Sequence, residues 1–270
     1  MAKTKVLITV TAYPLPSRSY DELVCTAGVR EDGSWVRIYP VPFKFLEFKK
    51  YQWVELDLQE PRQKDFRPES HSPAKPDLSD MEVVGELGTK YNWEDRKKFC
   101  LQHVYTNMTK LIDDSKEPTN TSLATFKPAE IIDLIVEPDE KDWKKDWLDQ
   151  LSQLDLFTSG KGQKPREPIR KVPYKFKYHF KDETGRESKM MIEDWEIGAL
   201  YWNCLRDAEG NENIAVQKVK QKYFNDIALT KDVYLFLGTT SEGHRRRWSN
   251  PFVIIGVFYP PKVVQTRLDI

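Results

Sequence analysis

A regular alternation of apolar and polar residues between positions 171 and 180 limits what this chain can fold into. The apolar face carries Val172, Tyr174, Phe176, Tyr178 and Phe180. The opposite face carries Lys171, Lys175, Lys177 and His179. Successive side chains of a strand point to opposite faces of its sheet, so this period of two predicts a half-buried strand. Gly185 lies in a turn-like segment just beyond it, which predicts a hairpin that returns through Met190 to Ile192.

The first third of the chain is also rich in β features. Short alternating runs predict strands over residues 6–10, 23–29, 35–39 and 53–58. Asp32-Gly33 predicts a tight turn between the second and third of these strands. Residues 61–80 are rich in proline, serine and charge, which predicts a long loop. We therefore expect a small β-barrel-like unit over residues 1–88.

The middle of the chain has the spacing of helices. Apolar residues recur every three or four positions from Trp93 to Ile112, and again from Asp139 to Leu154. Residues 126–136, between the two expected helices, predict one more strand. We expect this helical segment, residues 89–157, to pack on the N-terminal unit.

A linker rich in glycine, lysine and proline, residues 158–170, leads into the last part of the chain. After the hairpin, helices are expected over about 194–206 and 213–229. Two apolar runs, 234–238 and 252–258, are short enough to be central strands. The expected fold class is α+β, in which a C-terminal mixed α+β unit over 158–270 completes the fold. The two β units could share one core.

Composition excludes several classes of protein. The 270 residues are 39% hydrophobic, which is enough for a core, and their formal net charge is zero. That balance excludes a strongly polyanion-coating protein but allows a local basic patch. Three scattered cysteines, Cys25, Cys100 and Cys204, argue against a disulfide framework and a four-ligand zinc site. Without a secretion signal or an apolar run of about 18 residues, the protein is expected to be cytoplasmic and without a membrane partner.

No familiar catalytic motif is present. The sequence has no glycine-rich phosphate loop, no nucleophile elbow and no pair of histidines at metal-binding spacing, and no cofactor is expected. Its four histidines, His71, His103, His179 and His244, sit in four different contexts and are interpreted as surface or packing residues. Asp194 and Glu196 are the candidate catalytic carboxylates of a metal-dependent enzyme. The alternative is that Asp194 caps the following helix and Trp195 docks it into the core.

Basic and aromatic residues supply the first of three candidate binding surfaces. Trp35, Arg37 and Tyr39 share one face of an expected strand. An arginine between two rings could pair with a phosphate while the rings stack on bases. The alternative is a sheet that is buried on both faces, with Arg37 in a salt bridge.

The second surface is the basic stretch 161–181, which has eight cationic residues and one acidic residue. Lys175 and Lys177 share a strand face with His179, which suits a row of phosphates. The alternative is a solvated edge strand whose lysines prevent aggregation.

The third surface is the segment 243–250, where Arg245, Arg246, Arg247 and Trp248 are adjacent. It links two expected core strands, so it should be an exposed loop. Three neighbouring arginines repel one another, and a polyanion would relieve that repulsion. The alternative is a solvated charged face. We expect these arginines to form one continuous positive face with Lys175 and Lys177.

Several of these segments resemble an uncharacterised bacterial family. The matching runs are Cys25-Thr26-Ala27-Gly28-Val29, Trp35-Val36-Arg37-Ile38-Tyr39-Pro40-Val41-Pro42-Phe43, Arg67-Pro68-Glu69-Ser70, Asp194-Trp195-Glu196 and residues 250–258. Many relatives carry a Cys-x-x-x-x-Cys-x-x-His run before the Asp-Trp-Glu segment. Here residues 182–189 contain neither cysteine nor histidine, so no metal is expected at that position.

Members of this family are often encoded near mobile or defence-type genes, which implies work on nucleic acid. The favoured function is therefore binding of DNA or RNA within a bacterial defence or regulatory system. One alternative is a metal-dependent nuclease or nucleotide hydrolase. Another is a subunit that contacts only other proteins of a larger complex, such as the proteins of a defence system.

Overall fold

The computed structural model describes residues 3–16, 22–43, 46–61, 65–145 and 169–263. Most of the helix expected over 139–154 and nearly all of the linker expected over 158–170 lie outside the described residues. The described part confirms the α+β class. None of its helices is both long enough and apolar enough to cross a membrane.

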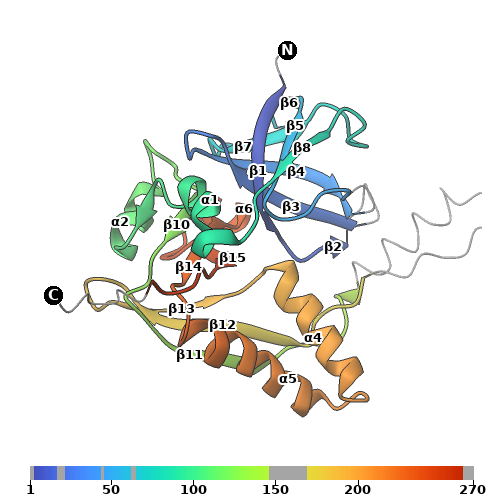
Figure 1. The fold of residues 1–270 in the computed structure, drawn as a ribbon, viewed down its shortest axis with the longest axis vertical. Coiled ribbons are helices and arrows are strands. Elements are labelled where there is room, and N and C mark those ends of the chain that lie inside the picture. Colours follow the sequence, from blue (N-terminus) through green and yellow to red (C-terminus); the bar gives the residue numbers. More distant parts are fainter. Residues whose placement is uncertain (1–2, 17–21, 44–45, 62–64, 146–168, 264–270) are drawn as a thin grey trace, which may run out of the picture.

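The N-terminal part is one curled sheet in the strand order β6-β7-β4-β3-β1-β5-β8, with β2 paired to β3 (Figure 1). Its strands are β1 (Thr4–Thr11), β2 (Leu15–Pro16), β3 (Glu22–Val29), β4 (Trp35–Pro42), β5 (Gln52–Leu56), β6 (Leu58–Gln59), β7 (Ser70–Pro73) and β8 (Glu82–Glu86). The first three strands expected here are confirmed, and the fourth, expected over 53–58, is β5 followed by the start of β6, which pair with different strands. The long loop expected over 61–80 is wrong in part, because β7 within it pairs in parallel with β4.

The chain then forms two smaller sheets. One has the order β15-β14-β10-β9 and the other the order β11-β12-β13. Their strands are β9 (Val104–Tyr105), β10 (Leu123–Phe126), β11 (Glu130–Pro138), β12 (Tyr174–Lys181), β13 (Glu187–Met191), β14 (Tyr234–Thr239) and β15 (Phe252–Phe258). The β12–β13 hairpin is confirmed. The strand expected over 126–136 is instead the end of β10 and most of β11, which belong to different sheets.

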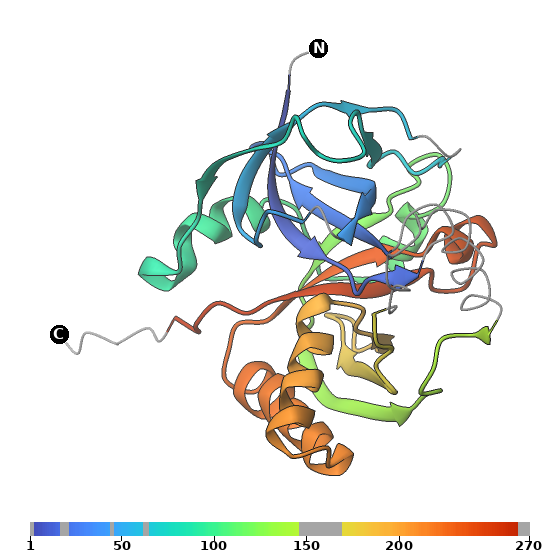
Figure 2. The same ribbon diagram turned by 90° about the vertical axis from the view of Figure 1, so that its right-hand side faces the viewer.

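The helices lie around these sheets. They are α1 (Lys90–Cys100), α2 (Met108–Asp114), α4 (Trp195–Asp207), α5 (Glu212–Lys220), which continues as the π-helix η2 (Gln221–Ala228), and the short α6 (Ser241–Arg245). The helix expected from Trp93 to Ile112 is two helices, α1 and α2, separated by β9. The helices α4 and α5 cover the three-stranded sheet (Figures 1 and 2), where Tyr178 and Phe180 pack into one cluster with Tyr201 and Val219.

β14 and β15 lie between the N-terminal sheet and the three-stranded sheet (Figure 2). Trp35 of β4 meets Phe236 of β14 edge-on, with ring centroids 5.3 Å apart, and Phe236 stacks on Phe258 of β15. These rings belong to a buried cluster that also contains Leu7 and Trp53 of the N-terminal sheet. The two β parts therefore share a core, and one face of the curled sheet is closed to solvent.

Candidate functional site

A pocket of about 230 Å³ lies where α6 meets the segment after α2 and the segment before β7. Its lining residues are Phe66, Ser115, Lys116, Glu117, Asn120, His244, Arg245, Arg247, Trp248 and Pro251. They come from three segments that are far apart in the sequence. We name this hollow the α6 pocket.

The short helix α6 is fixed at both ends. Thr240 caps its start, since the Thr240 hydroxyl accepts a 3.0 Å hydrogen bond from the Gly243 N–H. At its end the Trp248 N–H donates to the Gly243 carbonyl over 3.0 Å, and the Arg247 N–H donates to the His244 carbonyl over 3.1 Å. This is the Schellman arrangement, which needs a left-handed residue and usually takes glycine there. Here the residue is Arg247, with φ of 52°.

Two aromatic rings line the α6 pocket and stay largely in solvent. Phe66 is 50% exposed and Trp248 is 49% exposed. Trp248 lies against the helix backbone at Gly243, where a Cβ atom would come within 2.7 Å of its Cε3 atom. A glycine at position 243 therefore lets the indole ring pack on α6 while half of its surface remains free for contact with a ligand.

Three cations and one carboxylate line the same pocket. Lys116 pairs with Asp113, and Arg247 lies 3.5 Å from Glu117 in a pair that is mostly exposed. Exposed pairs contribute little free energy, so Arg247 can exchange its partner easily. Arg245 has no carboxylate partner among the described residues. The rim of the pocket therefore has an excess of positive charge that is available to an anion.

His244 lies on the inner side of the pocket and is only 6% exposed. Its Nδ1 atom is 3.0 Å from the Thr239 hydroxyl. Its Nε2 atom is buried and makes no hydrogen bond of good geometry among the described residues. Burial is the main cause that lowers the pKa of His244, and an interaction with the Ser115 backbone opposes it. The imidazole therefore forms a rigid inner wall of the pocket.

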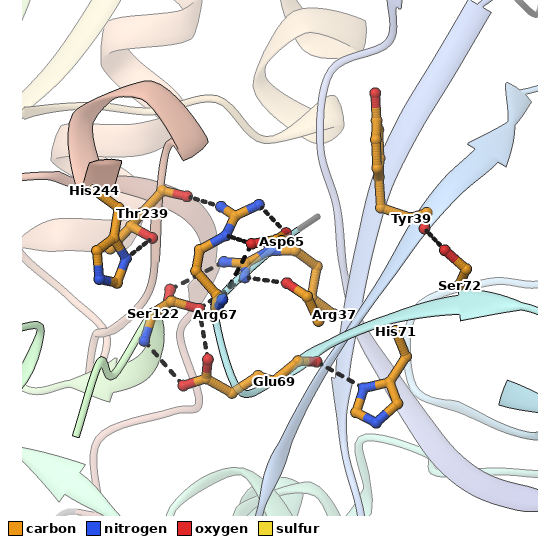
Figure 3. A network of polar contacts seen from close by, with 11 residues as sticks. Arg37, Tyr39, Asp65, Arg67, Glu69, His71, Ser72, Ser122, Thr239 and His244 are labelled. Carbon is orange, nitrogen blue, oxygen red and sulfur yellow. Dashed lines mark hydrogen bonds and ion pairs between the residues drawn. The ribbon is translucent and has the colours of Figure 1, made fainter. Parts of the chain in front are cut away.

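A polar network continues behind His244 (Figure 3). The Thr239 carbonyl accepts a 2.8 Å hydrogen bond from Arg67, and Arg67 forms a two-pronged ion pair with Asp65 at 2.8 and 2.6 Å. Burial opposes ionisation of Asp65, but the hydrogen bonds and charge of Arg67 outweigh it and lower the pKa of Asp65 to about 2. This network holds the strand end that carries Thr239, and so holds the imidazole of His244.

Arg37 and Glu69 extend the network between the N-terminal sheet and β10. Arg37 is 2% exposed and donates to the Ser122 hydroxyl over 2.7 Å and to the Ser122 carbonyl over 3.0 Å. Glu69 accepts from the Ser122 hydroxyl and N–H, over 2.6 and 2.9 Å. The charge of Arg37 is thus balanced through Ser122 rather than by a direct ion pair.

The first candidate surface does not form on the outside of the molecule. Trp35 is 9% exposed and Arg37 is 2% exposed, while Tyr39 is half-buried. The reason is that β14 and the start of β10 pack over this face of β4, so Trp35 meets Phe236 of β14 and Arg37 meets Ser122, directly before β10. The alternative of a sheet buried on both faces is confirmed, although Arg37 is held by serines and not by a salt bridge.

The lysines of the second surface are paired with acidic residues. Lys175 lies 3.2 Å from Asp139, and Lys177 is hydrogen-bonded to Glu137 of the neighbouring strand β11. β12 is the central strand of its sheet rather than an edge strand. Because the charge of β12 is balanced locally, Lys175 and Lys177 do not extend the positive rim of the α6 pocket into one continuous face.

The third segment is exposed from Arg245 to Ser249, but the exposed loop expected over 243–250 is wrong in part, because Gly243 and His244 are buried in helix α6. Arg245, Arg247 and Trp248 all line the α6 pocket, whereas Arg246 pairs with Glu242 on the helix surface. No sequence pattern indicated that Phe66 and Asn120 would join them. The run Arg67-Pro68-Glu69-Ser70, noticed only as a family pattern, supplies side chains behind the pocket.

The candidate catalytic carboxylates are held by a lysine. Asp194 is 1% exposed and accepts from the Glu196 N–H over 3.2 Å, so the expected cap of α4 is confirmed. Lys50 lies 2.8 Å from Asp194 and 3.0 Å from Glu196. Trp195 packs between Tyr13 and Phe43 of the N-terminal part. Among the described residues, no group of three or more potential metal ligands gathers here or elsewhere.

Comparison with known proteins identifies the family. The model described as domain of unknown function DUF8757 matches residues 104–269, and that of DUF8758 matches residues 2–102. The chain belongs to the DUF8757 family. No curated protein matches it. A solved structure of a murine DNA-binding protein with double-stranded DNA aligns over the full length of both chains, with 10% identity and a TM-score of 0.31, which carries no argument about fold or function.

Proposed function

We propose that this member of the DUF8757 family binds single-stranded nucleic acid at the α6 pocket. The observation that carries the proposal is the pair of half-exposed rings, Phe66 and Trp248, next to the exposed arginines of α6. Proteins that bind single strands combine cations, which follow the phosphate backbone, with aromatic side chains that stack on the bases. The α6 pocket has both components within one hollow.

A solvated charged loop is the plain alternative, and two features argue against it. Two large half-exposed rings, Phe66 and Trp248, line one hollow, and clustered exposed apolar surface is typical of binding sites. Phe66 is also held in place, because it meets the buried His244 edge-on with ring centroids 5.0 Å apart. A loop that was only solvated would need neither feature.

Single strands fit the pocket better than duplexes. Stacking on Phe66 or Trp248 needs a free base face, and the bases of a duplex already stack on one another. The net charge of zero also favours a local contact with few phosphates over an extended one along a duplex.

The test is a fluorescence anisotropy titration of labelled single-stranded DNA and RNA and of a duplex, each at several salt concentrations. We expect both single strands to bind more tightly than the duplex. The double variant R245A/R247A should bind more weakly and should reduce the slope of log affinity against log salt by about 1.4, which is about 0.7 for each lost phosphate contact.

The matched control is the double variant K175A/K177A, which removes the same number of charges from β12. It should bind like the parent, because Lys175 and Lys177 are already paired with carboxylates. If this control weakens binding as much as R245A/R247A does, the nucleic acid lies on β12 and the proposed site is wrong. If the parent binds no oligonucleotide at low salt, the proposed function is wrong.

A further inference from the structure

We infer that the α6 pocket takes a single unstacked nucleobase, which stacks on Phe66 or Trp248 and is hydrogen-bonded by Asn120. This inference rests on the proposed function and names the part of the strand that the pocket recognises. The size of the pocket, its aromatic rings, Asn120 and the rigid His244 each support it.

The size of the pocket limits what can enter. At about 230 Å³ it is smaller than the roughly 300–1,000 Å³ of pockets that hold drug-sized ligands. One flat ring system with its sugar at the rim fits such a space, whereas two stacked bases do not. The remaining nucleotides of a strand would lie outside, near Arg245 and Arg247.

The aromatic groups are suited to hold a flat ring. Phe66 stands edge-on to His244, with centroids 5.0 Å apart and planes at 87°. Trp248 is fixed on α6 by its contact with Gly243. The two rings come from segments far apart in the sequence, and each leaves about half of its surface exposed. A base could therefore stack on either ring without displacing a packed side chain.

Asn120 supplies hydrogen-bonding capacity that the protein itself leaves almost unused. Among the described residues its side-chain amide reaches only the Pro118 carbonyl, at 3.5 Å, which is a long bond. An asparagine amide offers a donor and an acceptor side by side and can bind the edge of a base with both. Asn120 lines the pocket and adopts φ of 52°, a left-handed conformation that asparagine tolerates well.

His244 forms the inner side of the pocket, and it is held rigidly. Thr239 binds its Nδ1 atom, Arg67 binds the Thr239 carbonyl, and Asp65 fixes Arg67. Its Nε2 atom is buried, so the imidazole acts as a wall that supports Phe66 and not as a ligand group. The base edge is therefore left to Asn120.

The experiment is a competition assay in which a mononucleotide, ribose 5-phosphate or inorganic phosphate displaces a labelled single-stranded oligonucleotide at constant ionic strength. We expect the mononucleotide to compete and the two ligands without a base to fail at the same concentration. Displacement by ribose 5-phosphate as strong as that by the mononucleotide would overturn the inference and leave a simple phosphate site.

Variants give an independent arm of the test. Asn120→Gly removes the amide but keeps the left-handed backbone, so it should fold normally and lower the affinity for the mononucleotide about 2- to 10-fold. Trp248→Ala should lower it about 5- to 100-fold, with an unchanged salt slope because stacking releases no counterions. If the oligonucleotide binds but neither variant weakens either ligand, the inference falls and the proposed function stands. If no oligonucleotide binds, both fall.

Discussion

Phe66 and His244 meet edge to face, with their rings 5.0 Å apart, although one lies before β7 and the other in α6. The same segment before β7 sends Arg67 to the carbonyl of Thr239, directly before α6. The aromatic wall and the polar inner side of the α6 pocket are therefore set by one contact between the N-terminal sheet and the end of β14. Changes at this contact should affect both folding and binding, and the two effects can be separated.

His244 should make stability depend on pH. Burial lowers its pKa below the unfolded value of about 6.5, although an interaction with the Ser115 backbone opposes this shift. Arg67 and Arg37 add smaller lowering effects, and Glu69 a smaller raising one. Because the pKa of His244 is lower in the folded state, the unfolded state binds the proton more readily. The resulting stability is fully present at pH values above the unfolded pKa, and it is lost as the pH falls through the folded pKa. The free energy of unfolding should thus decrease from pH 7.5 to pH 5 more steeply in the parent than in His244→Gln. Parallel pH profiles from urea denaturation of the two proteins would contradict this expectation.

Arg247→Gly should separate stability from binding. Arg247 is left-handed, which costs a non-glycine residue about 1–2 kcal/mol, so glycine should leave the protein equally stable or stabilise it by up to about 1 kcal/mol. The same change removes one cation from the α6 pocket, so oligonucleotide affinity should fall and the salt slope should decrease by about 0.7.

The control for this pair of effects is Arg246→Gly. Arg246 has an ordinary negative φ of −83°, pairs with Glu242 and does not line the pocket. This variant should lose a few tenths of a kcal/mol in melting experiments and bind like the parent. Weaker binding by both variants to the same degree would mean that only the general charge of the loop matters.

The sequence predicted local β structure well, because local patterns carry that information. The alternation over 172–180 predicts which residues of β12 are buried, and it is confirmed for Phe176, Tyr178 and Phe180. β7 was missed because Ser70–Pro73 has no apolar alternation, and its pairing with β4 is made by the backbone. The residues of a strand that forms mainly through backbone pairing with its neighbour need not alternate between apolar and polar, so their sequence does not predict the strand.

The candidate site was only partly predictable for a related reason. Alternation places Trp35, Arg37 and Tyr39 on one face of β4, but it does not say that the distant strands β10 and β14 will cover that face. The exposed arginines of α6 and Trp248 were found from their own segment. Their neighbours Phe66 and Asn120 come from distant segments, and only the tertiary structure brings them to the same pocket.

Arg37 should matter for folding rather than for direct contact with nucleic acid. Arg37→Met removes three hydrogen bonds to Ser70 and Ser122 and leaves Glu69 without its compensating charge, so the free energy of unfolding should fall by about 3 kcal/mol. Glu69→Gln should cost less in a protein that already carries Arg37→Met than it costs in the parent. Urea denaturation of the parent, the two single variants and the double variant measures this coupling. Additive losses would show that Ser122 does not link the two charges.

The pair of Lys50 and Asp194 should behave as a buried ion pair that joins the N-terminal part to α4. Burial raises the pKa of Asp194 to about 6 despite the opposing charge of Lys50. Lys50→Met would leave this buried carboxylate without a cation, and at pH 7.5 the cost should be about 3 kcal/mol. A raised carboxyl pKa means that the protonated form is favoured in the folded state. Without Lys50 the pKa of Asp194 rises further, so the penalty relative to the parent should shrink as the pH falls towards about 6 and should be small below it. Asp194→Asn keeps the cap of α4, since asparagine caps as well as aspartate, and it removes the buried charge. The double variant K50M/D194N should consequently be more stable at pH 7.5 than Lys50→Met alone.

Urea denaturation of the four proteins at pH 7.5 and pH 5 provides the measurement. A cost for Lys50→Met that is equal at both pH values, and unchanged by Asp194→Asn, would show that Lys50 acts through packing or through Glu196 and not through the charge of Asp194.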